Sequence, residues 1–258
     1  MRRLLVPAVL ALAAAGCGGS DGAASESVTV DGAEYAYVMP DEIEGGIVSM
    51  RFRNVGKEPH EFAFGRIDGG HTIDETIRDL FANDGNVPYV KDLGGVPLLS
   101  PGAEVTITRT LAPGTYGFLC FVPNAAGKVH LKLGMKRQFR VVGKSVAELP
   151  EPDAVITATK SGFDVPPIES GAQTLQFRNE SGEDREWNLT VYAPGKTSKD
   201  VDAWANGGLK GDAPATFYGA MQSIPSGTSV FLTLGLESGT TYVLEDLDAG
   251  IRAEIKPT

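Results

Sequence analysis

Four residues in the first half of the chain have side chains that bind soft transition metals: His60, Cys120, His130 and Met135. Two imidazoles, one thiolate and one thioether make up the trigonal site with a weak axial ligand in which proteins hold redox-active copper. Nine residues lie between Cys120 and His130, and four lie between His130 and Met135. The set predicts one type 1 copper site, built from a distant histidine and one ligand loop.

Each of these residues also has a plain structural explanation. His60 could be a hydrogen-bonded histidine at a strand end, Cys120 a small core residue, and Met135 a filler of a packing gap. Together, however, they include two of the three histidines in the chain, and they occur in the order that such a site needs. The third histidine, His71, follows two glycines, and we expect it to be an exposed loop residue.

Paired strand patterns in the two halves of the chain could position this site. Residues 47–54 and 174–179 both alternate apolar and polar side chains, and both end in Phe-Arg-Asn. A strand is predicted after each of the turns that follow. These and the later paired strands are expected at residues 60–64 and 187–192, 105–108 and 230–234, 114–120 and 239–245, and 137–142 and 251–255.

One short helix is predicted in each half. Thr72 and Glu75 have the spacing of a capping box and precede apolar residues at helical intervals. Ser198 precedes Val201 and Trp204 in the same way. Many short strands separated by regular turn signals predict an all-β chain of two tandem Greek-key β-sandwich domains with short helical insertions. Such a sandwich can hold a distant histidine rigidly beside a ligand loop.

Several stretches of the first half resemble the cupredoxin family. They are residues 54–62 (Asn-Val-Gly-Lys-Glu-Pro-His-Glu-Phe), residues 114–120 (Gly-Thr-Tyr-Gly-Phe-Leu-Cys), Val129-His130 and Gly134-Met135. The resemblance covers residues 28–142, with a fainter echo in residues 153–258. It implies that His60 and His130 bind copper through ring nitrogens, that Cys120 gives the short copper–sulfur bond, and that Met135 lies axially. The gap after Cys120 is similar to the longer ligand loops of the family.

The second half lacks these ligands. Alignment of Asn54 with Asn179 places Arg185 where His60 stands, and alignment of the later tyrosines places Asp246 near Cys120. Residues 143–258 contain no His or Cys. We therefore expect a cupredoxin-like domain without copper ligands and with a structural or docking role. Its Trp187 and Trp204 are either core residues or part of a partner surface.

The N-terminus has the pattern of an export signal. Arg2 and Arg3 precede a continuous apolar stretch at residues 4–15, and Cys17 follows in a sequence that resembles the lipobox of bacterial lipoproteins. The alternative is a plain secretory signal with a chance cysteine. If Cys17 carries a lipid, Cys120 has no intramolecular disulfide partner, and it is then a buried thiol, an intermolecular disulfide or a metal ligand.

These patterns divide the chain into five segments. They are a lipoprotein signal peptide (1–16), a flexible tether (17–27), a copper-binding cupredoxin domain (28–143), a linker (144–152) and a cupredoxin-like domain without copper ligands (153–258).

The composition limits the partners and the function. A formal net charge of −10 argues against nucleic acid as a partner and suits a basic redox partner protein. We expect an exported blue copper protein that carries single electrons and is held by its N-terminal lipid on the extracytoplasmic side of a membrane. We do not expect an enzyme, because only His71 remains to bind a second, catalytic copper ion. The alternatives are a copper-delivery lipoprotein or a metal-free interaction module.

Overall fold

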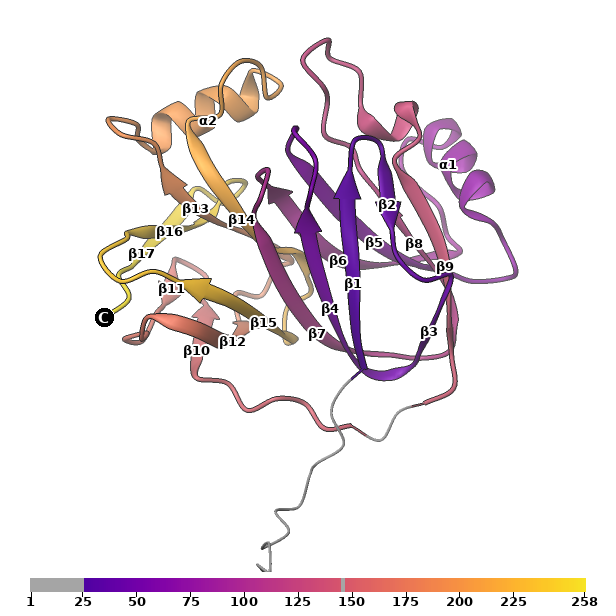
Figure 1. Ribbon diagram of the computed structural model, residues 1–258, viewed down its shortest axis with the longest axis horizontal. Coiled ribbons are helices and arrows are strands. Elements are labelled where there is room, and N and C mark those ends of the chain that lie inside the picture. Colours follow the sequence, from indigo (N-terminus) through magenta and orange to yellow (C-terminus); the bar gives the residue numbers. More distant parts are fainter. Residues whose placement is uncertain (1–25, 145–146) are drawn as a thin grey trace, which may run out of the picture.

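The computed structural model describes residues 26–144 and 147–258 of the chain. Within these residues two β-sheets lie against each other around a shared apolar core, and only short helices accompany them (Figure 1). The predicted all-β fold of two β-sandwich domains is confirmed. The predicted signal peptide, Cys17 and most of the predicted tether lie outside the described residues. In the described part of the chain, no helix has the length and apolar character needed to cross a bilayer.

The first domain contains helix α1 (Ile73–Ala82), the short 3-10 helix η1 (His130–Leu133) and the first group of strands. Those strands are β1 (Glu26–Ala33), β2 (Ala36–Val38), β3 (Glu42–Glu44), β4 (Gly46–Asn54), β5 (His60–Ile67), β6 (Val90–Leu99), β7 (Glu104–Leu111), β8 (Gly114–Leu119) and β9 (Lys136–Val142).

The second domain contains helix α2 (Ser198–Asn206) and the remaining strands. They are β10 (Ala154–Ala158), β11 (Phe163–Asp164), β12 (Gly171–Asn179), β13 (Arg185–Tyr192), β14 (Ala215–Ile224), β15 (Ser229–Leu236), β16 (Tyr242–Asp246) and β17 (Ile251–Ile255).

Both sheets run without a break through the two domains. One has the strand order β11-β10-β12-β15-β7-β4-β1-β2, and the other has the order β17-β16-β13-β14-β6-β5-β8-β9-β3. The domains are joined where β7 pairs with β15 and where β6 pairs with β14, both antiparallel. The two sandwiches are therefore fused edge to edge, and each covers sheet edges that the other would expose.

The fused domains are related by a local two-fold axis. Phe52 pairs with Val105 in the first domain, and Phe177 pairs with Val230 in the second, so the repeat matches Ile107 with Leu232. In the structure Ile107 and Leu232 are direct partners across the junction. A residue that pairs with its own counterpart lies on a two-fold axis.

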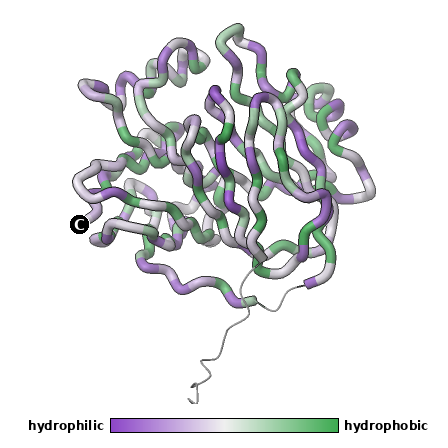
Figure 2. The backbone as a smooth tube through the Cα atoms, in the orientation of Figure 1, coloured by the Kyte–Doolittle hydropathy of each residue, from purple (hydrophilic) through white to green (hydrophobic). Residues whose placement is uncertain are grey.

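Local sequence explains the elements that matter for the site. Side chains of β4 alternate between the core and the surface, with Phe52 buried and Arg51 exposed. Hydrophobic and hydrophilic residues likewise interchange along the strands of the first domain (Figure 2). Helix α1 begins after Thr72, which forms the predicted capping box with Glu75. Helix α2 begins at Ser198, and its N-cap is Thr197 rather than Ser198, because Thr197 and Asp200 form an equivalent box.

Candidate metal centre

Three of the predicted ligands meet at one end of the first domain. The Nδ1 atoms of His60 and His130 are 3.1 Å apart, and the Sγ atom of Cys120 is 3.4 Å from Nδ1 of His130. The potential ligand atoms of the three residues all lie within 4.8 Å of one another. All three side chains have an exposed fraction of 0%. The cluster is therefore a buried group of one sulfur and two nitrogens that could hold a metal ion.

The position of His60 is fixed by the turn that follows β4. The buried Asn54 donates from Nδ2 to the carbonyl oxygens of Glu58 and Leu99, both at 2.8 Å, and accepts the N–H of Gly56 at 2.9 Å. These bonds close the turn directly before β5, whose first residue is His60. The predicted turn after Asn54 thus fixes the position of His60.

The long gap between Cys120 and His130 is folded into a small hairpin. Pro123 and Val129 form an isolated antiparallel bridge, and Asn124 closes the tip by accepting the N–H groups of Ala126 and Lys128, both at 3.0 Å. The N–H of His130 then donates to the carbonyl of Val122 at 2.9 Å. The hairpin contains the residues between Cys120 and His130, and it brings the imidazole of His130 next to the thiol of Cys120.

Met135 lies beside this cluster. Its N–H donates to the carbonyl of His130 at 3.0 Å, and its carbonyl accepts the N–H of Cys120 at 3.3 Å. Its side chain is fully buried. A Cβ atom at Gly32 would lie 3.5 Å from both Met135 Cε and His60 Cδ2, so the thioether arm and the first imidazole adjoin the same glycine.

The spacing of the donor atoms fits a metal ion. Protein-bound zinc, a comparable ion, bonds imidazole nitrogen at about 2.0 Å and thiolate sulfur at about 2.3 Å. Two such bonds at the tetrahedral angle of about 109° separate nitrogen from nitrogen by about 3.3 Å and nitrogen from sulfur by about 3.5 Å. The observed separations of 3.1 and 3.4 Å lie within about 0.2 Å of these values.

Two glycines make room for the first imidazole. A Cβ atom at Gly56 would lie 2.8 Å from His60 Nε2, and a Cβ atom at Gly32 would lie 3.0 Å from the ring of Phe62. Any larger residue at either position would push a side chain of the cluster or of its wall. Gly32 and Gly56 are thus part of the site, and the sequence analysis did not include them.

Burial controls the protonation of the cluster. Desolvation, assisted by repulsion from His130, lowers the pKa of His60 to about 4. Desolvation also lowers the pKa of His130, which Glu58 opposes. It raises the pKa of Cys120 to about 12, and the carboxylate of Glu61 adds to that rise. At neutral pH the protein thus presents two neutral imidazoles and one thiol, and binding of a metal ion displaces the thiol proton.

Glu61 links the site to the second domain. Its Oε1 accepts the N–H of Phe121, the residue after Cys120. Its Oε2 accepts a hydrogen bond of 3.2 Å from Nε2 of Gln222, on β14. Burial raises the pKa of Glu61 to about 7. The backbone beside the thiol is therefore tied to both domains, which the sequence analysis did not anticipate.

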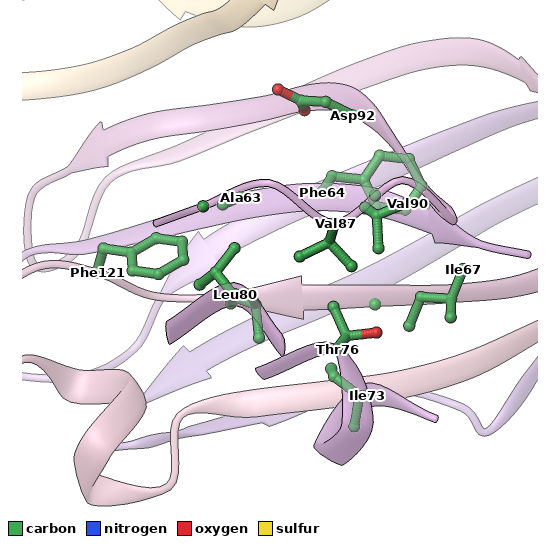
Figure 3. Close-up of a pocket in the computed structure, with 14 residues that line it drawn as sticks. Ala63, Phe64, Ile67, Ile73, Thr76, Leu80, Val87, Val90, Asp92 and Phe121 are labelled. Carbon is green, nitrogen blue, oxygen red and sulfur yellow. The ribbon is translucent and has the colours of Figure 1, made fainter. Parts of the chain in front are cut away.

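Buried aromatic rings pack together on the side of the cluster that faces the core. Phe52 and Phe62 meet edge to face at 4.9 Å, and Phe118 packs on Phe52 at 5.5 Å. Phe62 and Phe118 are fully buried, whereas Phe121 is 37% exposed. Phe121 lies at the edge of an apolar cavity of about 260 Å³ between α1 and strands β5 and β8 (Figure 3).

The matching position of the second domain lacks the two histidines and the cysteine of the cluster. In the strand registers Ala63 pairs with Leu119, and Asn188 pairs with Glu245, so Asp246 takes the place of Cys120. Arg185, the first residue of β13, takes the place of His60. The connection from β16 to β17 ends at Ile251, which leaves no segment equivalent to the hairpin that carries His130.

The remaining residues singled out in the sequence lie away from the cluster. His71 stacks on Tyr89 with ring centroids 3.7 Å apart and lies 3.8 Å from Glu75. Trp187 is a core residue with an exposed fraction of 0%. Trp204 is partly buried and stacks on Phe217 at 5.5 Å. Cys17 is outside the described residues.

The solved structures that are similar to this chain include copper proteins, and their sequence identities and TM-scores are low. No protein-family model matches the chain, and no curated protein matches it. A reduced auracyanin from Roseiflexus castenholzii is 27% identical and covers 46% of this chain and 98% of its own, with a TM-score of 0.33. Auracyanin A from Chloroflexus aurantiacus, described as a "blue" copper protein, is 23% identical over 46% of this chain and 100% of its own, with a TM-score of 0.32.

Other solved structures match most of the chain. A copper-containing nitrite reductase from Thermus scotoductus is 14% identical and covers 91% of this chain and 62% of its own, with a TM-score of 0.26. Several multicopper oxidases also match 90 or 91% of the chain. The fold described above rests on the strand order of the chain itself.

The prediction that the chain is not an enzyme is wrong. The structures that match about nine tenths of it are a nitrite reductase and multicopper oxidases, and these are enzymes. The prediction counted only the histidines of one chain, which leaves His71 alone for a second copper ion. Carboxylates and residues of a second chain also supply metal ligands, so that count does not decide the matter.

Proposed function

We propose that the first domain binds one copper ion in a type 1 site and uses it to accept and donate single electrons. Nδ1 of His60, Nδ1 of His130 and Sγ of Cys120 would hold the ion, with Met135 as the weak axial ligand. The observation that carries the proposal is the convergence of these three donor atoms within 4.8 Å in a fully buried cluster. Two imidazoles with one thiolate are the donor set of blue copper centres.

The chain supports such an ion by rigidity and by exclusion of water. Copper would supply the change of oxidation state. The backbone bonds from His130 to Val122 and from Cys120 to Met135 fix the ligand loop on β8 and β9. The rings of Phe62 and Phe118 keep the cluster dry. Ligands that are held by packing need little reorganisation when the charge of the ion changes.

A visible spectrum of the purified protein with added Cu(II) tests this function. We expect an intense absorption band from thiolate-to-copper charge transfer. Cys120→Ser should abolish the band, because it removes the one cysteine sulfur of residues 26–144 and 147–258, the part that the structure describes. His71→Ala is the matched control and should keep it, because His71 packs on Tyr89 outside the cluster. Absence of the band in the wild-type protein, or its loss in the control, would contradict the proposal.

We also propose that the protein is exported and anchored by a lipid on Cys17, on the extracytoplasmic side of a membrane. The support is the sequence pattern of a charged start, an apolar stretch and a cysteine after small residues. An acidic protein in that place suits a redox partner with a basic surface. Expression of Cys17→Ala should move the protein from the membrane fraction to the soluble fraction. An unchanged distribution would count against the anchor.

A further inference from the structure

A carboxylate lies behind the ring of His130, on the side away from the cluster. Oε2 of Glu58 is 3.0 Å from Nε2 of His130. The oxygen is off the axis of the ring N–H bond, so the contact is a charge beside the ring rather than a linear hydrogen bond. The imidazole is fully buried, while the carboxylate side chain is 30% exposed. The ring of His130 thus lies between the cluster and a negative charge.

Tyr35 holds this carboxylate in place. Its hydroxyl donates to Oε2 of Glu58 at 3.1 Å. Its ring packs against the ring of His130, with centroids 5.0 Å apart. The backbone of Glu58 is fixed as well, because its carbonyl accepts from Asn54. Tyr35, Glu58 and His130 therefore form a connected group in which each side chain touches the other two.

The backbone of Tyr35 is strained. Tyr35 lies in the tight turn between β1 and β2 and has a φ angle of 61°. Residues with a side chain rarely adopt this left-handed conformation, and a glycine would adopt it at lower cost. Strain of this kind collects at functional sites, where the side chain is needed at that position. Here the side chain of Tyr35 contacts both Glu58 and His130, and these contacts require a tyrosine in the strained position.

We propose that Glu58, held by Tyr35, is a positioning and charge-tuning residue for His130. Its carboxylate keeps the ring proton on Nε2, so the lone pair of Nδ1 would be available to bind an ion. Its negative charge stabilises the more positive oxidation state of the ion and so lowers the reduction potential. The effect of Glu58 on the reduction potential rests on the proposed copper function. Its effect on the position of the ring proton does not.

Glu58→Gln tests both parts, because it removes the charge and keeps the size of the side chain. We expect Cu(II) binding to weaken about tenfold relative to Cu(I), which raises the midpoint potential by about 59 mV. Affinity for Zn²⁺, which has no redox chemistry, should fall about tenfold or more. Tyr35→Phe keeps the ring and removes the hydroxyl, so it should shift both quantities in the same direction by less. In the Glu58→Gln background it should add nothing.

Controls separate this effect from a general loss of charge or fold. Glu42→Gln removes an exposed carboxylate from β3 and should change neither the potential nor the Zn²⁺ affinity. Glu58→Asp should restore part of both. An unchanged potential and unchanged Zn²⁺ affinity in Glu58→Gln, in a wild-type background that binds copper, would overturn the inference and leave the proposed function standing.

Nitrogen NMR of the histidine side chains, recorded without added metal, decides the positioning role independently. We expect the proton of His130 on Nε2 in the wild-type protein, and a mixture of tautomers in Glu58→Gln. Failure of the wild-type protein to bind copper would remove the proposed function, and this measurement would still support or overturn the role of Glu58. The same tautomer in both proteins would overturn it.

Discussion

Arg185 and Asp246 form a buried ion pair at the place in the second domain that His60 and Cys120 occupy in the first. Nη1 of Arg185 is 3.4 Å from Oδ2 of Asp246, and the two side chains are 8% and 2% exposed. Ser181 and the N–H of Ala249 bond to the two members of the pair. A pair of opposite charges thus fills the position that is a candidate metal centre in the other domain.

Removal of one partner of this pair should destabilise the second domain. We expect Arg185→Met to lower the free energy of unfolding by about 3 kcal/mol, because it leaves the carboxylate of Asp246 buried without a counter-charge. Urea denaturation monitored by tryptophan fluorescence measures this. The double change Arg185→Met with Asp246→Leu should recover most of the loss. A single variant as stable as the wild-type protein would show that the pair has no structural role.

A transplanted pair of ligands should not create a second copper centre. The combined variant Arg185→His and Asp246→Cys restores two of the side chains of the first domain. The turn from Asp246 to Ile251 still provides no counterpart of His130 or Met135. In a Cys120→Ser background, added Cu(II) should therefore give no intense charge-transfer band. Such a band would show that the hairpin before His130 is dispensable for the site.

Gly56 should be essential for the site and less important for the fold. Gly56→Ala brings a methyl group to 2.8 Å from His60 Nε2 and from Glu34 Oε1, so the imidazole must move. We expect copper affinity to fall at least tenfold and the free energy of unfolding to fall by about 1–2 kcal/mol. Gly235→Ala is the control, because nothing lies within 4 Å of its added methyl group. Equal copper affinity in both variants would contradict the role of Gly56.

Metal uptake should depend on pH through the thiol. The pKa of Cys120 is raised to about 12 and that of His60 is lowered to about 4. Between pH 7 and 9, therefore, the thiol is the ligand whose proton an ion must displace, and affinity should rise about tenfold per pH unit. As the pH falls through about 4, His60 also gains a proton and the dependence should steepen.

Competition with a chelator at several pH values measures this slope. Proton release in weakly buffered solution gives the same number directly, and we expect about one proton per ion at pH 7. An affinity that does not change with pH would mean that the thiolate is already formed in the folded protein.

The repeat and the ligand set could be predicted from the sequence because both are local. The alternation in residues 47–54 and 174–179 marks half-buried strands, and Asn54 and Asn179 both stabilise the turns that follow. His60 begins β5 and Cys120 follows β8, so the pairing of β5 with β8 brings the two residues to the same end of the sandwich. The lengths of the loops then explain why the second domain has no counterpart of His130.

The junction between the domains could not be predicted in this way. β6 contains Pro97 and the consecutive glycines Gly94 and Gly95, which are typical of turns rather than strands. Both glycines have positive φ angles, of 77° and 135°, and an added Cβ atom would lie 2.0 Å from a backbone oxygen at either position. Close packing against β14 and β5 requires them there, and that contact is a property of the tertiary structure.

The contacts among Tyr35, Glu58 and His130 could not be predicted from the sequence either. These residues come from a hairpin turn, a loop and a short 3-10 helix, none of which has a periodic pattern. Only the fold shows that the turn between β1 and β2 closes over the second imidazole. A tyrosine in a two-residue turn, where glycine is preferred, is the single signal in the sequence that could have drawn attention to these contacts.

The direction of β1 separates the start of the described chain from the candidate metal centre. Val30 pairs with Phe52 in a parallel register, so β1 ends at Ala33 beside the cluster and starts at Glu26 about 23 Å away (Figure 1). The lipid proposed for Cys17 would therefore be attached to the end of the sandwich that lies away from the candidate metal centre. A redox partner of the kind proposed above would approach the opposite end.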